Sequence, residues 1–156
     1  MHHYTATISW SRGEQPFIDN RYSRRHLIRF DGGVQIPASA SPQIVRVPLS
    51  DPAAVDPEEA FVAALSSCHM LSFLSIAARE KFCVDSYVDE ASGIMEKNAA
   101  GKWAVSVVTL KPRIACSGRI VPSHEQLLDL HHRAHEECFI ANSVRTEVRC
   151  EPEMAS

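Results

Sequence analysis

The chain has 156 residues, of which 45% are hydrophobic, and a formal net charge of -3 from 16 basic and 19 acidic side chains. This size is typical of one compact unit with its own core, so we predict a single domain over residues 1–156. Charge of one sign forms no long run, which argues against nucleic-acid partners and against a polybasic membrane patch, and favours small or apolar partners.

The N-terminus "MHHYTATISW" lacks the charged and apolar regions of a secretory signal, so the expected compartment is the cytoplasm. The chain contains 5 cysteines. A reducing compartment argues against a fixed disulfide framework, which leaves cysteine chemistry, metal binding or plain burial as the explanations for these side chains.

Three strands are predicted in the N-terminal third. Residues 4–10 alternate between apolar and polar side chains, as in a half-buried antiparallel strand. Residues 25–30, followed by "DGG", predict a second strand that ends in a turn. Residues 43–49 predict a third, and Pro48 suits the edge of a sheet because proline cannot donate to a strand ladder. The segment 11–24 is polar and is predicted to be irregular.

A long helix follows. Asp56 suits the N-cap and Pro57 the first helical position, while Glu58 and Glu59 favour the positive end of the helix dipole. Residues 60–78 are apolar or small on every side, which indicates a helix buried in a membrane or in a protein core. The run is at the short limit for a membrane span and contains polar side chains, so we predict a buried central helix that a partner subunit helps to cover.

The C-terminal half alternates between sheet and helix. Stretches 83–96 and 103–117 predict a hairpin around "KNAAGK". Ser123 and Gln126 have the spacing of a capping box and predict a second helix. Its apolar face is predicted to contain Leu127, Leu128, Leu130, Ala134 and Cys138. Residues 144–150 predict a last strand, so the fold class is α+β with antiparallel sheets.

Cys68 lies in the middle of the apolar helix. Burial raises the pKa of a thiol, so a reactive Cys68 needs a cation nearby. His69 is about 100° further round the helix and points elsewhere. Glu58 is too far along the helix to touch Cys68, but it can orient an arginine from another segment by a bidentate pair. The candidates are Arg21, Arg24 and Arg25. The alternative is that Cys68 is a small buried core residue.

Cys138 is predicted near the C-terminal end of its helix, where the dipole disfavours a thiolate, so it suits a resolving thiol better than an attacking one. His131, His135 and Cys138 are spaced along one helical face, which leaves zinc binding as an alternative, although a fourth ligand and paired CxxC spacing are absent. The other three cysteines are expected to be small core residues. They are Cys83, Cys116 and Cys150.

The stretches "DPEEAFVAALSSCHM" and "AHEECFIANSV" resemble the OsmC/Ohr family of thiol-dependent organic hydroperoxide reductases, and within it an OsmC-like subgroup. The family pattern is a proline, a glutamate, a cysteine ten positions later in a buried helix, and a second cysteine near the end of a later helix. Pro57, Glu58, Cys68 and Cys138 match it in order and spacing. The resemblance covers nearly the whole chain and implies an OsmC-like fold of two intertwined chains, a homodimer with the long helices at its centre.

The resemblance also implies a mechanism. Cys68 attacks an organic hydroperoxide and becomes a sulfenic acid, Cys138 condenses with it, and an external dithiol reduces the disulfide; the family suggests a dihydrolipoyl protein, and no cofactor or metal is expected. The family's arginine pairs with Glu58, and Arg24 is the preferred match ahead of Arg25 and Arg21. The chain departs from the family at Phe139, where a proline commonly follows the second cysteine.

Apolar side chains near these thiols would admit alkyl hydroperoxides and exclude water. Phe61, Leu65 and Phe139 are the predicted substrate-binding residues. Because proteins that share a fold can differ in activity, the alternative function is a non-catalytic dimer of this fold that binds an apolar or thiol-reactive ligand.

Overall fold

The computed structural model describes residues 1–155. They form two compact units, one over Met1–Ala60 and one that begins at Phe61, and each is described by itself. The prediction that residues 1–156 form one domain stays a prediction.

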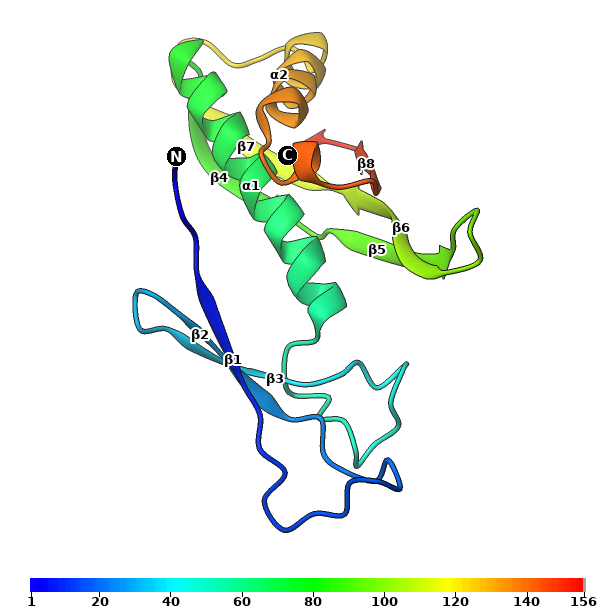
Figure 1. Cartoon of the computed structure of the whole chain (residues 1–156). Coiled ribbons are helices and arrows are strands. Elements are labelled where there is room, and N and C mark those ends of the chain that lie inside the picture. The colour runs from blue at the N-terminus through cyan, green and yellow to red at the C-terminus, as the bar shows by residue number, and fades with distance from the viewer. Residues whose placement is uncertain (156) are drawn as a thin grey trace. The chain divides into compact units, whose positions relative to one another are not determined.

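The first unit contains a three-stranded antiparallel sheet of β1 (Ala6–Ser9), β2 (His26–Phe30) and β3 (Gln35–Ala38), in that order (Figure 1). The first two predicted strands are therefore confirmed as strands, but β1 is exposed along its whole length in the single chain and is not half-buried as predicted.

The predicted third strand at 43–49 is wrong, because those residues form turns and the strand lies earlier in the chain. Gly33 adopts a φ of 88°, which a glycine reaches without steric cost, and the Phe30 amide donates to Val34 O at 3.0 Å. The chain reverses at once, and β3 takes the place beside β2.

Helix α1 (Pro57–Arg79) begins with a reciprocal cap. The Glu59 amide donates to Asp56 Oδ1 at 2.8 Å, and the Asp56 amide donates to Glu59 Oε2 at 3.1 Å. This is a capping box with aspartate at the N-cap, so the predicted helix start is confirmed.

Among the described residues only one face of α1 is buried, so the prediction that a partner subunit covers the rest of this helix stays a prediction. The buried residues are Leu65, His69, Phe73, Ile76 and Ala77. Leu71, on another face, is 61% exposed. By length and composition α1 could cross a membrane, but the core helix of a soluble protein passes the same test.

The second unit contains two further three-stranded sheets. One has the order β4 (Cys83–Asp89), β7 (Pro112–Ser117), β9 (Glu153–Met154), and the other has the order β5 (Ser92–Lys97), β6 (Trp103–Leu110), β8 (Glu147–Cys150). The predicted hairpin is confirmed for β5 and β6, and the last strand is confirmed as β8. Each predicted long stretch, however, is two strands in two sheets, and the β6–β8 and β7–β9 pairs are parallel, so the sheets are mixed.

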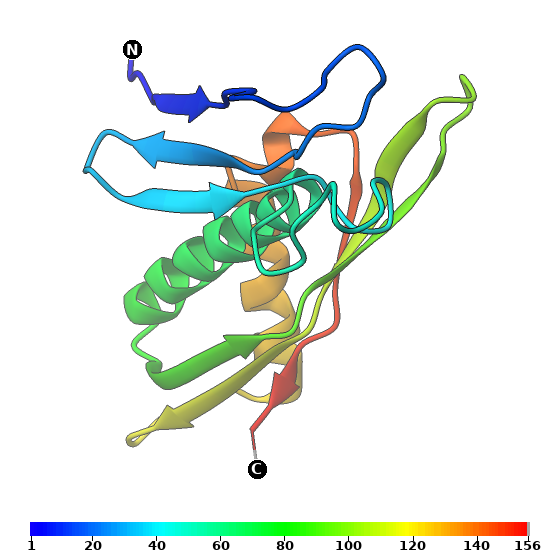
Figure 2. The same ribbon diagram turned by 90° about the horizontal axis from the view of Figure 1, so that it is seen from below.

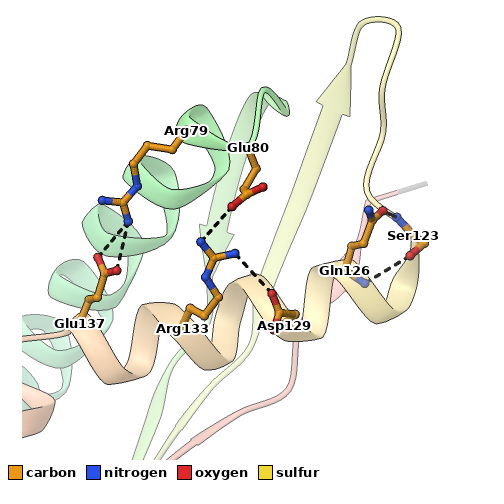
Figure 3. Close-up of polar contacts among 7 residues, drawn as sticks. All are labelled: Arg79, Glu80, Ser123, Gln126, Asp129, Arg133 and Glu137. Atoms are coloured by element: carbon orange, nitrogen blue, oxygen red, sulfur yellow. Dashed lines mark hydrogen bonds and ion pairs between the residues drawn. The ribbon is translucent and has the colours of Figure 1, made fainter.

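Helix α2 (His124–Glu137) begins with the predicted capping box. The Gln126 amide donates to Ser123 Oγ at 3.2 Å, and the Ser123 amide donates to Gln126 Oε1 at 2.9 Å (Figure 3). Most of the predicted apolar face is buried, but Leu128 is 45% exposed and faces away from the core. A short 3-10 helix, Ala141–Ser143, follows.

Both helices pack on one face of the β4-β7-β9 sheet, as Figure 2 shows. The core between them contains Phe73, Ile76, Ala77, Ile114, Leu127, Leu130 and Ala134. A second cluster joins Leu65 of α1 to Val108 and Leu110 of β6. These two clusters fix α1, α2 and β8 around the residues described next.

Candidate functional site

The structure brings Cys68 and Cys138 together in the second unit. Cys68 is half-buried in the middle of α1, and Cys138 is buried at the C-cap of α2. The two side chains are near enough that the Cys68 thiol affects the pKa of Cys138, and both thiols are free. Two neighbouring cysteines on two packed helices can form a disulfide once movement brings their Cβ atoms to disulfide spacing.

The surroundings of Cys138 keep it protonated. Burial raises the pKa of Cys138 to about 11; the Ala141 amide, which donates to Sγ at 3.4 Å, opposes this rise, and the Cys68 side chain adds to it. A thiol at a helix C-terminus gains nothing from the helix dipole as an anion. Cys138 therefore resembles a resolving thiol in its electrostatics more than an attacking one.

The predicted substrate-binding residues do not line a single surface. Leu65 is fully buried in the second core cluster, with Phe61 packed against it, whereas Phe139 is 80% exposed directly after Cys138. Leu65 thus serves as a core residue in this chain. The Phe139 side chain faces solvent, although Cys138 beside it is buried.

Arg24 and Glu58 both belong to the first unit, and within its described residues they do not pair. The Arg24 guanidinium donates to Asn20 O at 3.0 Å, to Asn20 Oδ1 at 2.7 Å and to Tyr22 O, and it stacks on the Tyr22 ring at 3.9 Å. Glu58 has one buried carboxylate oxygen that lacks a partner. The predicted Arg24–Glu58 pair stays a prediction, and Arg25 is engaged elsewhere, with Asp51 at 2.9 Å.

An apolar pocket of about 460 Å³ lies beside Arg24 in the first unit. Trp10, Phe17 and Tyr22 line it and pack against one another, with ring centroids 4.7 to 5.8 Å apart. Sequence reasoning missed this pocket because segment 11–24 is polar on average; the aromatic residues in and next to this segment, Trp10, Phe17 and Tyr22, were the available signal. The pocket can take an apolar molecule with an anionic end next to Arg24.

A second group of functional side chains lies on the other side of α1 from Cys68. His69 Nε2 and His131 Nδ1 are 2.9 Å apart, and Cys150 Sγ lies 3.7 Å from the first and 3.6 Å from the second. The zinc alternative on His131, His135 and Cys138 is therefore wrong in its partners, because His131 faces α1 and β8. His69 does point away from Cys68, as predicted.

Burial controls the charge of this second group. It lowers the pKa of His69 to about 4 and that of His131 to about 3, with mutual repulsion between imidazolium ions adding to the effect at His131. Both imidazoles are neutral at pH 7. Of the cysteines expected in the core, Cys150 and Cys116 are half-buried, but Cys83 is exposed at the start of β4, where the sheet meets solvent.

Comparisons with known proteins agree with this fold. The family model described as OsmC-like protein matches residues 50–153. An OsmC-like protein of unknown function from Vibrio cholerae is 56% identical, with a TM-score of 0.96 over 98% of this chain and 100% of that chain. No curated protein matches the chain.

Two more distant structures share the fold. An organic hydroperoxide resistance protein from Elizabethkingia anophelis has a TM-score of 0.68 at 14% identity, covering 100% of this chain and 97% of that chain. The organic hydroperoxide resistance protein OhrB of Bacillus subtilis has a TM-score of 0.61 at 16% identity, covering 99% of this chain and 98% of that chain. The sequence match over residues 50–153 and the 56% identical relative establish that the chain belongs to the OsmC-like protein family.

Proposed function

We propose that the protein is a thiol-dependent peroxidase that reduces organic hydroperoxides to alcohols. The observation that carries the proposal is the proximity of the half-buried Cys68 to the buried Cys138. Relatives of the same fold are organic hydroperoxide resistance proteins, which supports this substrate class.

The reaction has two steps on the protein. The Cys68 thiolate attacks the terminal peroxide oxygen, the O–O bond breaks, and the alkoxide leaves and takes up a proton as the alcohol; the sulfur is oxidised to a sulfenic acid. Cys138 then attacks this sulfur, an S–S bond forms, and the hydroxyl group leaves as water with the Cys138 proton. An external dithiol supplies two electrons and two protons to regenerate both thiols.

Arg24 has the role of the cation that holds the Cys68 thiolate, oriented by Glu58. The unpartnered buried oxygen of Glu58 supports this assignment, because a buried carboxylate gains most from a guanidinium partner. In its present position Arg24 is bound to Asn20 and Tyr22. The proposal therefore includes a change of Arg24 partners, from these acceptors to Glu58.

The proposal extends to partners. A homodimer would cover the faces of α1 that stay open in one chain, including Leu71, which is 61% exposed. A protein-bound dihydrolipoyl group is the proposed reductant, and no metal takes part in the peroxide chemistry. The proposed compartment is the cytoplasm.

The test uses the purified full-length protein with cumene hydroperoxide and dihydrolipoamide. Peroxide consumption is measured for the wild type, for Cys68→Ser and for Cys83→Ser, which removes an exposed thiol on β4 as the matched control. Turnover should fall by about a thousandfold or more in Cys68→Ser, since the nucleophile is lost, and should stay unchanged in Cys83→Ser. Peptide mapping after one equivalent of peroxide should recover a Cys68–Cys138 disulfide. Full turnover by Cys68→Ser would overturn the proposal.

A second candidate function is a non-catalytic dimer of this fold that binds an apolar or thiol-reactive ligand. The aromatic pocket beside Arg24 favours it, because Trp10, Phe17 and Tyr22 offer an apolar binding surface that needs no redox chemistry. Equal peroxide consumption by the wild type and by a Cys68→Ser/Cys138→Ser double variant, with a ligand-induced change in Trp10 fluorescence in both, would support this candidate.

A further inference from the structure

A buried cluster of two imidazoles and one thiol lies where the two core clusters of the second unit meet. His69 comes from α1, His131 from α2 and Cys150 from the end of β8. Three elements far apart in sequence thus each contribute one potential metal ligand. The donor atoms all lie within 4.8 Å of one another.

The distances between the donor atoms fit a shared ion. A metal bound at about 2.0–2.1 Å to nitrogen and about 2.3 Å to sulfur holds nitrogen and sulfur about 3.5–3.8 Å apart in tetrahedral or trigonal geometry. Cys150 Sγ lies 3.7 Å from His69 Nε2 and 3.6 Å from His131 Nδ1. The two nitrogens, 2.9 Å apart, need to separate by only about 0.5 Å to reach the corresponding spacing.

The packing around the cluster holds the rings in place. The two imidazoles are nearly parallel, at 4°, and Phe73 stacks on His131 with a centroid distance of 4.2 Å. His69 and His131 are 1% and 2% exposed. Ligands that are fixed before the ion arrives lose little conformational freedom on binding.

The cluster is poorly satisfied by hydrogen bonds among the described residues. The 2.9 Å contact uses one ring nitrogen of each histidine, and the other two, His69 Nδ1 and His131 Nε2, are buried without a partner. These two nitrogens lie on the far sides of the rings from the potential ligand atoms, so an ion at the site would leave them as they are. The potential ligand atoms themselves contact one another, at 2.9, 3.6 and 3.7 Å.

We propose that His69 Nε2, His131 Nδ1 and Cys150 Sγ bind one thiophilic transition-metal ion, Zn²⁺ or Cu⁺, in the interior of the second unit. Imidazole and thiolate are ligands that both ions accept, and both tolerate few ligands in tetrahedral or trigonal geometry. Cys150 loses its proton to solvent when the metal–sulfur bond forms. The ion joins α1, α2 and β8 and is independent of the proposed peroxide chemistry.

The first experiment measures binding to full-length protein that has been reduced and stripped with a chelator. Zn²⁺ is titrated in one arm, and Cu⁺ buffered by bicinchoninate is titrated anaerobically in the other. One ion per chain is expected in at least one arm, and competition between the arms identifies the preferred ion. At free ion about a thousand times the dissociation constant, the unfolding midpoint should rise by about 10 °C.

Matched variants identify the ligands. Cys150→Ser and His131→Gln should lose the ion and the midpoint shift, whereas Cys83→Ser and His132→Gln, which change an exposed cysteine and an exposed histidine, should keep both. A Cys68→Ser/Cys138→Ser double variant tests the competing thiol pair and should also retain the ion. Loss in that double variant with retention in Cys150→Ser would overturn the proposal, as would substoichiometric binding in both arms.

X-ray absorption on the metal-loaded wild type keeps the test independent of the folding of any variant. The expected first shell contains two imidazole nitrogens and one sulfur. A shell without sulfur, or with two sulfurs, contradicts the site. Peroxidase turnover plays no part in these readouts, so failure of the metal site and failure of the proposed function can be told apart.

Discussion

Cys68 and His69 are neighbours in sequence, yet they belong to two different environments in the second unit. Cys68 is half-buried and lies near the thiol of Cys138, whereas His69 is 1% exposed and lies against an imidazole and the thiol of Cys150. One step along a helix rotates a side chain by about 100°. The fold uses that rotation to separate the Cys68–Cys138 pair from the cluster of His69, His131 and Cys150.

The largest effect is expected from removing Phe73, the ring that packs on the cluster of His69, His131 and Cys150. Phe73→Ala deletes a ring that is 1% exposed and stacks on His131 at 4.2 Å. Large-to-small changes of this kind in a core cost about 3–5 kcal/mol. Urea unfolding measures the loss in the free energy of unfolding. The control is Phe139→Ala, which removes a ring that is 80% exposed and should change the free energy of unfolding by less than about 0.5 kcal/mol. Similar losses in both variants would contradict the assignment of Phe73 to the core and of Phe139 to the surface.

The sequence predicts contacts between residues that are close along the chain better than contacts between residues that are far apart along it. The capping boxes at Asp56 and Ser123 are local patterns of four residues, and the structure contains both. The pairing of Cys68 with Cys138 could be predicted because the family resemblance links these two residues. By contrast, the cluster of His69 with Cys150 depends on a parallel pairing between β6 and β8, which no local pattern specifies.

The errors also have physical causes. Residues 43–49 are β-branched and apolar enough to suggest a strand, but the tight turn at Gly33 places residues 35–38 beside β2 first. Residues 83–96 contain two strands in different sheets, because a break at Glu90 and Ala91 lets the chain change partners. The partners of Arg24 could not be predicted, since two of its three acceptors are backbone carbonyls whose direction depends on the local turn.

The next prediction concerns pH and the Cys68–Cys138 pair. Burial is the largest cause that raises the pKa of Cys138 to about 11 in the reduced protein, and this burial persists when Cys68 is oxidised, so the thiolate fraction of Cys138 should increase about tenfold per pH unit through the neutral range. After rapid oxidation of Cys68 by excess cumene hydroperoxide, the rate of disulfide formation should rise without a plateau between about pH 6 and pH 10. Quenched-flow samples resolved by mass spectrometry follow this step. A plateau near pH 9 would indicate a Cys138 thiol with an ordinary pKa and would contradict the burial argument.

A smaller effect is expected at the start of helix α2, which positions both His131 and Cys138. Helix α2 contains His131, Cys138 is its C-cap, and Ser123 is its N-cap. Ser123→Ala should cost about 1 kcal/mol of the free energy of unfolding, because the Gln126 amide loses its acceptor. Ser123→Asp is the matched control, since aspartate also accepts this hydrogen bond, and it should restore most of the loss. Equal destabilisation by both substitutions would show that the cap contributes nothing.

The smallest effect is expected from the ion pairs that join α1 to α2 at the surface. Arg79 donates to Glu137 at 3.1 Å directly beside Cys138 in sequence, and Arg133 contacts Glu80 at 3.0 Å (Figure 3). Both pairs are substantially exposed, so a double-mutant cycle on Arg79 and Glu137 should give a coupling below about 1 kcal/mol.

Arg79→Gln also tests whether this ion pair affects the rate at which Cys68 and Cys138 form a disulfide. Disulfide formation depends on how closely α1 and α2 approach at Cys138, whereas the buried cluster is held by Phe73 and by the core around it. Arg79→Gln should therefore slow the Cys68–Cys138 condensation by no more than about threefold, the scale of a surface ion pair, and should leave metal binding unchanged. A larger effect on the condensation than on unfolding would mean that the ion pair positions the resolving thiol in addition to stabilising the helix pair.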